Sequence, residues 1–446
     1  FNSTAPYKER LLEKLSRQTH LFQKAAIMAG ARSLGMAFGA LGSVWAARCL
    51  GPLNFGISGM VQSLALLTNL FVTVIYPLVL IRDYKNIPDE GERNRLIGVT
   101  NGFRLAVSTA FCALAAAMLA LGLEPAAFRF AGWFFLPLLL LNALQPAWIF
   151  QAAEKQHFQS LLAVLQPALT ALFYAAFLRP GMSAGTDLLG ITLVSAVLTF
   201  IYWKAVFRLT PFKGAFFILN RWREAWALIY KSRWLFLSAL AIYVYNNLDQ
   251  PLLGWLHSLE EQGRYRTAVR VTDAAQSFLA ILPSIFFPRF IEWRKKGEAF
   301  FWARQKKLAL YGGALGVLAV ALVLKAIPFL YPMVFGAAYA GAAVPCVILV
   351  SAKIMDALGQ VFSLGLMTDH ANDKAVLMAT LGTASFSLGT NLLFIPRFGM
   401  VTAATVNLLS ETLMLGICFW LTARRIRRIR GEAAAGAALA SPPALP

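Results

Sequence analysis

The sequence has few charged residues and very few residues of the kinds that bind metals or form disulfides. Asp, Glu, Lys and Arg together make up 14% of the 446 residues, against about 25% in an average soluble domain. So little charge argues against a soluble domain, and equally against a nucleic-acid-binding protein, which would be charge-rich. The four cysteines and four histidines are scattered and show no CxxC or other ligand spacing. We therefore expect no disulfide framework, no metal site and no nucleic-acid partner.

The sequence also lacks the short motifs of common enzyme chemistry. It contains no Walker A loop, no GxGxxG, no HExxH and no GxSxG. No segment between its apolar runs is long enough for a nucleotide-binding or catalytic domain. These absences predict a transporter rather than an enzyme, with no catalytic residue and no bound cofactor.

Long apolar runs are what the sequence does contain. Hydrophobic residues make up 58% of the chain, and its mean hydropathy is +0.61. A membrane-spanning helix needs roughly 20 apolar residues. Twelve segments meet this condition: 21–47, 55–81, 97–122, 130–151, 158–178, 185–207, 234–256, 266–288, 308–330, 338–365, 375–395 and 400–422. The sequence predicts an all-α polytopic membrane protein with about 12 transmembrane helices.

Lysine and arginine alternate between the two sides of this topology. The chain has 41 basic and 21 acidic residues, a formal net charge of +20. If the amino terminus is cytoplasmic, 29 basic residues lie on the cytoplasmic side and 7 on the other side. This asymmetry is typical of the positive-inside rule. It predicts that both termini are cytoplasmic and that the cytoplasmic residues contact anionic membrane lipids.

Two halves of the chain resemble each other. Arg179-Pro180-Gly181-Met182 precedes the sixth run, and Arg397-Phe398-Gly399-Met400 precedes the twelfth. Short turns ending in glycine, 50–56 and 259–263, follow the first and seventh runs. The pattern predicts two six-helix lobes related by a parallel repeat, and transporters of this build place the substrate path between the lobes. The expected parts are a cytoplasmic segment (1–20), an N-lobe (21–207), a connector (208–233), a C-lobe (234–423) and a cytoplasmic tail (424–446).

The connector and the tail have compositions of their own. Residues 208–233 interleave basic and aromatic side chains, which is typical of an amphipathic helix in the headgroup region; an ordinary basic loop is the alternative. The tail is basic at first and then rich in alanine and proline. We expect its end, from Gly431, to be disordered.

Ionisable residues inside the spans are the strongest functional signal, because such a group must face a cavity or a partner. Of the 41 basic residues, five lie inside the expected spans and not in the loops: Lys24, Arg32, Arg104, Arg270 and Lys353. Lys24 is close enough to the cytoplasmic side to extend into the headgroups. Arg32 lies mid-span with no acidic residue on its own helix, which favours a cation lining a cavity. A cavity with surplus positive charge attracts an anionic substrate. The planar guanidinium of arginine is well suited to phosphate because it can donate two parallel hydrogen bonds to phosphate oxygens.

Acidic and amide residues lie in the C-lobe spans. Asn246, Asn247, Asp249 and Gln250 precede Pro251, and two helical stripes contain Arg266, Arg270 and Asp273, and Lys353, Asp356 and Gln360. Glu411 stands alone in the last run, one turn after Asn407. Arg270 with Asp273, and Lys353 with Asp356, could instead be internal ion pairs that neutralise each other. Asp249 could pair with an arginine or carry a transported cation.

Three ordered motifs resemble a known family. They are 47–56 (ARCLGPLNFG), 247–254 (NLDQPLLG) followed by 262–268 (QGRYRTA), and 391–399 (NLLFIPRFG) followed by Ala403-Ala404 and Ser410-Glu411. The chain resembles the polysaccharide-biosynthesis membrane proteins, which are Wzx-type flippases of O-antigen and exopolysaccharide units in the multidrug/oligosaccharidyl-lipid/polysaccharide exporter superfamily. Pro251 departs from the pattern, where an aliphatic residue is usual.

The resemblance implies a V-shaped, alternating-access transporter in the bacterial cytoplasmic membrane. Its cargo would be an undecaprenyl-pyrophosphate-linked oligosaccharide moved from the inner to the outer leaflet, in contact with the polysaccharide polymerase and export machinery. Under this reading a cationic cavity attracts the pyrophosphate, and it is lined by Arg32, Arg104, Arg270 and Lys353. The sugars are contacted by the amides of Asn246, Asn247 and Gln250. H⁺ or Na⁺ is carried by the carboxylates of Asp249, Asp273 and Asp356.

Two other functions stay open at this point. A cation-coupled multidrug exporter of the same superfamily would need an acid-rich cavity, which the surplus of intramembrane basic residues disfavours. A membrane glycan polymerase or glycosyltransferase would need a sizeable outer loop, and the outer loops of this sequence are short.

Overall fold

A computed structural model gives the fold of the chain. It describes the backbone of residues 5–122, 126–210, 212–214, 216–279, 282–367 and 373–440. Within these ranges, the side chains of 5–29, 32, 126–127, 274–275, 277–279, 282–285, 287–288, 373 and 429–440 lie outside the description.

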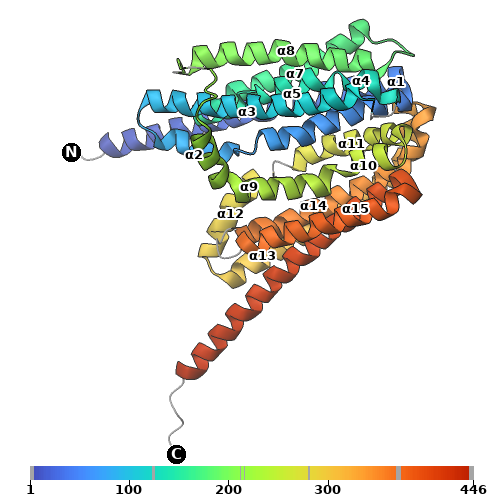
Figure 1. The fold of residues 1–446 in the computed structure, drawn as a ribbon. Helices are drawn as coiled ribbons and strands as arrows, with labels where there is room; N and C mark the ends of the chain where they lie inside the picture. The colour runs from blue at the N-terminus through green and yellow to red at the C-terminus, as the bar shows by residue number, and fades with distance from the viewer. Residues whose placement is uncertain are drawn as a thin grey trace, which may run out of the picture. The chain divides into compact units, whose positions relative to one another are not determined.

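Every regular element in the described ranges is a helix (Figure 1). In chain order they are α1 (Ala5–Val72), α2 (Pro77–Asn86), α3 (Glu90–Ala120), α4 (Ala126–Gly132), α5 (Phe135–Ala143), α6 (Ala147–Ala152), α7 (Gln156–Phe177), α8 (Ala184–Leu209), α9 (Trp222–Asn247), α10 (Asp249–Leu256), α11 (Leu259–Leu279), α12 (Leu282–Lys295), α13 (Glu298–Phe335), the short 3₁₀ helix η1 (Ala337–Ala342), α14 (Ala343–Met367) and α15 (Asp373–Ala440).

Nine described stretches are long and apolar enough to cross a membrane. Two of them, Ser33–Asn86 and Lys374–Arg428, are 54 and 55 residues long and each overlap two of the expected spans. Together the nine stretches overlap every expected span except 266–288, which coincides with the polar helix α11 and with α12. The overlap is partial for 21–47 and for 234–256, whose last residues form α10. The predicted all-α, polytopic membrane fold is confirmed.

Glycines divide the two longest helices. Gly51 in α1 has φ +70°, and Gly399 in α15 has φ +59°. A left-handed conformation is costly for residues that carry a Cβ and is readily adopted by glycine. Each glycine therefore ends one membrane helix and lets the next begin without a separate loop.

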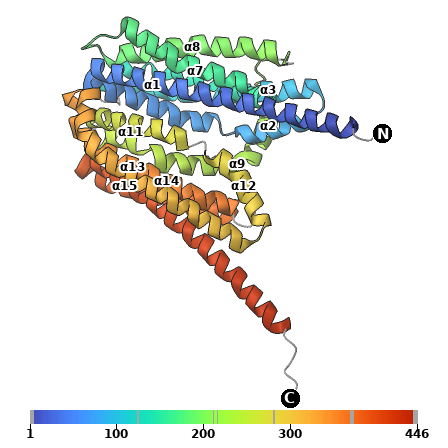
Figure 2. The ribbon, with the colours of Figure 1, turned by 180° about the vertical axis from the view of Figure 1, so that it is seen from behind.

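The chain divides into two compact units, 1–236 and 237–446, and the division falls within α9. In the first unit α7 packs beside α1 and α8 beside α7 (Figures 1 and 2). A core cluster of this unit joins Trp148 and Phe150 of α6 to Leu198 and Trp203 of α8. In the second unit α14 packs against both α13 and α15.

The segment between α8 and α9 differs from the expected interfacial helix. Its described residues between Leu209 and Trp222 are irregular, and only the part from Trp222 onward is helical, as the first turns of α9. The ring of Phe216 packs against Trp203 in a tilted arrangement, with ring centroids 4.1 Å apart. The Ile218 N–H donates to the Gly98 carbonyl at 3.0 Å. Phenylalanine in this segment thus contributes to the core of the first unit, where the sequence pattern suggested a lipid-facing surface.

A similar hydrogen bond recurs in the two units close to positions that the sequence repeat matches, although its donor is three residues after the glycine in the first unit and one residue after it in the second. In the first unit the Ala184 N–H, after Gly181 (φ +84°), donates to Asn54 Oδ1 at 3.4 Å. In the second unit the Met400 N–H, after Gly399, donates to Glu261 Oε2 at 3.0 Å. Asn54 and Glu261 each lie two residues before the matched glycines Gly56 and Gly263. A side chain at the start of one span therefore caps the start of another in both units.

The prediction of disorder from Gly431 is wrong for residues 431–440, which continue α15 to Ala440. Alanine is the best helix former, so the basic residues at the end of the last span are followed by a helical extension. Residues 441–446 lie outside the described ranges.

Candidate functional site

The clearest candidate for binding an anion is a buried polar stripe on α3. Asp89 caps this helix by accepting a hydrogen bond from the Glu92 N–H at 2.8 Å. Thr100, Arg104 and Ser108 follow at four-residue spacing, so they share one face. Arg104 is 3% exposed and Thr100 is fully buried. The stripe therefore places a guanidinium between two hydroxyls in the interior of the protein.

Arg104 has no counter-ion in the part of the chain that the structure describes. Its Nε has no hydrogen-bond partner there, and neither has Thr100 Oγ1. Burying a charge without a partner is unfavourable, and an unpaired donor adds to that penalty. An anion between the guanidinium and the hydroxyl would satisfy both groups, so the stripe has the chemistry of an anion-binding site.

The charged stripe predicted in span eight lies on α11. Ser258 caps this helix by accepting hydrogen bonds from the N–H groups of Glu260 (3.2 Å) and Glu261 (3.4 Å). Arg270 and Asp273 are both exposed, with Arg270 Nη1 3.9 Å from Asp273 Oδ2. The contact is the internal ion pair that the sequence left open, and its exposure keeps it weak. In a membrane protein such an exposed charged face must border water rather than lipid.

The polar cluster at the end of α9 surrounds a buried carboxylate. Asp249, 4% exposed, begins α10 and accepts hydrogen bonds from the Tyr265 hydroxyl (2.5 Å) and the Gln250 N–H (2.8 Å). Asn246, Asn247 and Gln250 are half-buried next to it. Its two oxygens are thus held by neutral donors. The predicted sugar-contacting amides and one predicted coupling carboxylate lie in one short segment of the chain, and their roles stay predictions.

Lys353 and Asp356 lie one turn apart on α14, and both are half-buried. Asp356 accepts hydrogen bonds from two amides, Gln276 Nε2 at 2.7 Å and Gln360 Nε2 at 3.0 Å. No ion pair joins Lys353 to Asp356 among the described contacts. Amide groups, rather than the lysine, hold this carboxylate.

Arg32 lies in the first half of α1, and its side chain is outside the described residues. Its expected place in a cationic cavity therefore stays a prediction. Within the described residues, no group of three or more His, Cys, Asp or Glu side chains could hold a metal ion.

Sequence reasoning missed Asp187. This carboxylate in the first turn of α8 is 1% exposed and accepts hydrogen bonds from the hydroxyls of Ser58 and Tyr174. The Ser58 hydroxyl in turn accepts from Gln62 Nε2 at 3.0 Å. The available signal was an acidic residue just inside an apolar run, which is easily taken for a loop residue. The network holds three spans of the first unit together.

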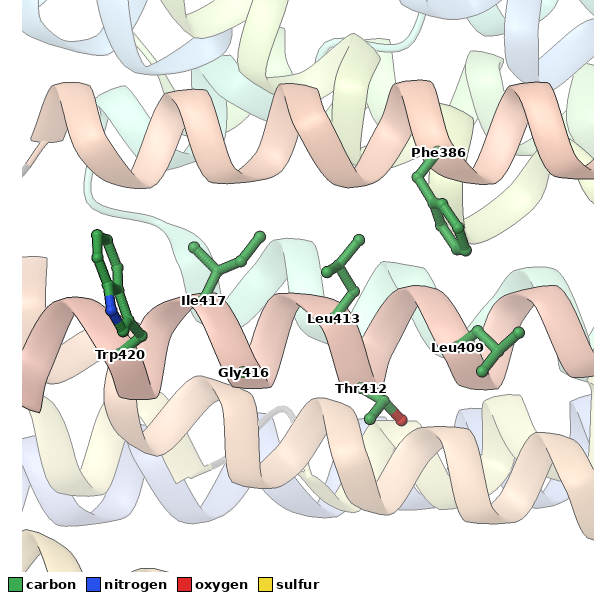
Figure 3. Close-up of a pocket in the computed structure, with 7 residues that line it drawn as sticks. All are labelled: Phe386, Leu409, Thr412, Leu413, Gly416, Ile417 and Trp420. Atoms are coloured by element: carbon green, nitrogen blue, oxygen red, sulfur yellow. The ribbon is translucent and has the colours of Figure 1, made fainter.

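An apolar groove lies along α15 in the second unit (Figure 3). It has a volume of about 570 Å³ and is lined by Phe386, Leu409, Thr412, Leu413, Gly416, Ile417 and Trp420. Phe386 points from the first half of α15 toward the second half, which supplies the other six residues. A groove of this composition offers nothing to a phosphate or a sugar, and it suits hydrocarbon chains.

Comparisons with known proteins bear on the family and the fold of the chain. Residues 21–293 match the model of a family described as polysaccharide biosynthesis protein. The Escherichia coli (strain K12) protein named "Putative O-antigen transporter" is 23% identical over 395 residues, which cover 83% of this chain and 89% of that protein.

Two solved structures share the fold. "Lipid II flippase MurJ, inward closed conformation" superposes with a TM-score of 0.71 at 11% identity, over 89% of this chain and 87% of that one. The inward-facing conformation of a multidrug resistance MATE family transporter of the MOP superfamily gives a TM-score of 0.56 at 12% identity, over 91% and 95%. At such low identities the likeness concerns the fold alone. The family match covers more than half of the chain, and the chain belongs to the polysaccharide biosynthesis protein family of multi-pass membrane proteins.

Proposed function

We propose that this protein is a flippase that moves undecaprenyl-pyrophosphate-linked oligosaccharide units from the inner to the outer leaflet of the bacterial cytoplasmic membrane. The family match, the name of the Escherichia coli relative and the fold shared with a lipid II flippase all support this proposal. The products would be building units of a surface polysaccharide such as O-antigen or exopolysaccharide.

Arg104 is the observation that carries the proposal. A buried guanidinium without a counter-ion is stabilised by an anion, and its planar fork matches phosphate oxygens. A pyrophosphate is the charged group of a lipid-linked oligosaccharide. Cationic drugs, the cargo of the multidrug exporter alternative, would instead be repelled by this residue.

Other predicted residues take supporting parts in the proposal. Arg270 and Lys353, with Arg32, would add positive charge along the path of the head group. Asn246, Asn247 and Gln250 would donate hydrogen bonds to sugar hydroxyls, since neutral amides suit them. Asp249, Asp273 and Asp356 would carry the coupling protons or sodium ions of an alternating-access cycle.

The proposed orientation follows from the basic loops. With both termini cytoplasmic, the 29 cytoplasmic basic residues face anionic lipids of the inner leaflet. The cargo would enter from that leaflet, where it is synthesised, and leave toward the polymerase and export machinery. The protein would bind and release its cargo without changing a covalent bond, as a transporter and not an enzyme.

A deletion strain tests the proposal against the polymerase alternative. Loss of a flippase leaves complete lipid-linked units on the inner leaflet, whereas loss of a polymerase leaves single units displayed outside. Accessibility of the units to a membrane-impermeant lectin, before and after the cells are opened, separates the two. Units that are labelled without opening the cells contradict the proposal.

A further inference from the structure

A second buried polar cluster lies in the second unit, on the face of α15 opposite the apolar groove. It consists of Asn391 in the first half of α15 and Asn407, Ser410 and Glu411 in the second half, and we call it the α15 cluster. All four are 0–3% exposed: Asn391 2%, Asn407 3%, Ser410 0% and Glu411 2%. The last three lie at i, i+3 and i+4 and so share one face of the helix.

The α15 cluster has more hydrogen-bond acceptors than donors. Glu411 Oε1 and the side-chain carbonyl oxygens of Asn391 and Asn407 have no hydrogen-bond partner among the described residues. The amide nitrogens of the two asparagines are used, by Ser387 Oγ (3.4 Å) and the Tyr245 carbonyl (3.5 Å). Ser410 Oγ also has no partner among the described residues, so its single hydroxyl donor is set against three unpaired acceptor oxygens. The cluster is therefore short of donors.

The cluster lies deep in the membrane. Glu411 is twelve residues beyond the break at Gly399, or about 18 Å along the helix, close to the middle of a hydrocarbon core about 30 Å thick. The two halves of α15 run antiparallel, and the Thr383 hydroxyl contacts Met414 Sδ across the pair at 3.9 Å. That register places Asn391 level with Asn407.

The charged and titratable groups around Glu411 do not form an ion pair with it. Glu411 interacts electrostatically with Asp356 and Lys353 of α14 and with Tyr245 of α9. Tyr245 also interacts electrostatically with Cys418. Asp356 is already held by two glutamine amides. Lys353 would offset part of the charge of Glu411, and Asp356 would oppose that effect. Among the residues that the structure describes, Glu411 thus has no dedicated counter-charge.

We propose that Glu411 binds and releases a coupling proton of the transport cycle. The added proton converts the carboxylate to a neutral carboxylic acid, which removes the buried charge and supplies a further donor to the cluster. Its release regenerates the carboxylate when water reaches the α15 cluster. The inference deepens the proposed function and rests on it for the transport cycle, and it adds Glu411 to the carboxylates Asp249, Asp273 and Asp356 that are proposed there.

Infrared difference spectroscopy of the purified full chain tests proton binding without any transport. Wild-type protein titrated with acid should show a carboxylic-acid carbonyl band that Glu411→Gln lacks. Asp356→Asn should keep the band, and Glu298→Gln, at a glutamate bonded to Arg425, should keep it too. A band unchanged in Glu411→Gln overturns the proposal. Glu411→Asp, which retains a carboxyl group, should restore it if the glutamine variant folds poorly.

Proteoliposomes with a fluorescent polyprenyl-pyrophosphate sugar test the coupling. Glu411→Gln should lose all acceleration of lipid exchange by a proton gradient, while Glu298→Gln keeps that acceleration. Retained acceleration by protons, or acceleration by sodium alone, overturns the assignment. If wild-type protein moves no lipid-linked sugar, the proposed function fails, and the infrared band still decides whether Glu411 takes up a proton.

Discussion

Replacing Arg104 by methionine should make the protein more stable and a weaker binder of pyrophosphate. Methionine has a similar length, no charge and no hydrogen-bond donor. It therefore removes the buried guanidinium, whose Nε has no partner in the described part of the chain, while filling most of its space. The two consequences have opposite signs, which separates a binding residue from a structural one.

The magnitude of each effect follows from the burial of Arg104. A buried polar group without a hydrogen bond costs about 1–3 kcal/mol in proteins, so the unfolding free energy should rise by about that amount. A hydrogen bond to a charged group contributes about 1.5–3 kcal/mol, and each 1.4 kcal/mol is a tenfold change in affinity. Loss of the guanidinium should thus weaken pyrophosphate binding roughly 10- to 150-fold.

Thermal unfolding in detergent measures both effects in one experiment. Without ligand, Arg104→Met should unfold at a higher temperature than the wild type. With inorganic pyrophosphate, the wild type should gain stability in proportion to its affinity, and the variant should gain much less. Arg208→Met is the matched control, since Arg208 is exposed at the end of α8. It removes the same formal charge and should leave both temperatures unchanged.

The reasoning is refuted if Arg104→Met unfolds at a lower temperature and binds pyrophosphate as tightly as the wild type. Arg104 would then be a structural residue with a protein partner. Arg104→Lys refines the test. It keeps the charge but not the planar fork, so its affinity should lie between those of the wild type and the methionine variant.

Three further predictions concern stability and the repeat. Asp187→Asn removes the charge that strengthens two buried hydrogen bonds, and thermal unfolding should show a loss of about 1–3 kcal/mol; an unchanged midpoint would contradict the role of this network. Asn54→Ala and Glu261→Ala remove matched caps, and each should cost about 0.5–2 kcal/mol in the same assay; a large loss in only one variant would argue against equivalent roles. Arg270→Gln breaks an exposed pair with Asp273 and should change stability by less than about 1 kcal/mol, while a larger loss would mean that Arg270 is a structural residue.

Helical periods and apolar runs were enough to predict the membrane fold. Eleven of the twelve expected spans overlap one of the nine apolar stretches, because hydrocarbon admits only helices with few charges. The connector was harder to predict, since Phe216 looks the same in sequence whether it faces lipid or packs on Trp203. Only tertiary contacts distinguish the two surroundings.

The candidate site was predictable in its residue types and less so in its pairings. The intramembrane position of Arg104 follows from counting charges within spans, but its lack of a partner depends on helices far away in sequence. The same holds for Asp356, which sequence spacing pairs with Lys353 and the fold pairs with Gln276 of α11. Asp187 was missed because hydroxyls of two other spans, Ser58 and Tyr174, determine its burial.

The central claim is that the protein moves a lipid-linked oligosaccharide across the membrane, and one reconstitution measures this directly. Purified protein is placed in vesicles that contain a fluorescent polyprenyl-pyrophosphate oligosaccharide, and an impermeant quencher reports the leaflet that holds the label. The account predicts that the protected fraction exchanges between leaflets only when the protein is present, and that excess pyrophosphate-linked competitor blocks the exchange. A protected fraction that stays constant, in vesicles where the same protein extrudes a cationic dye, would contradict it.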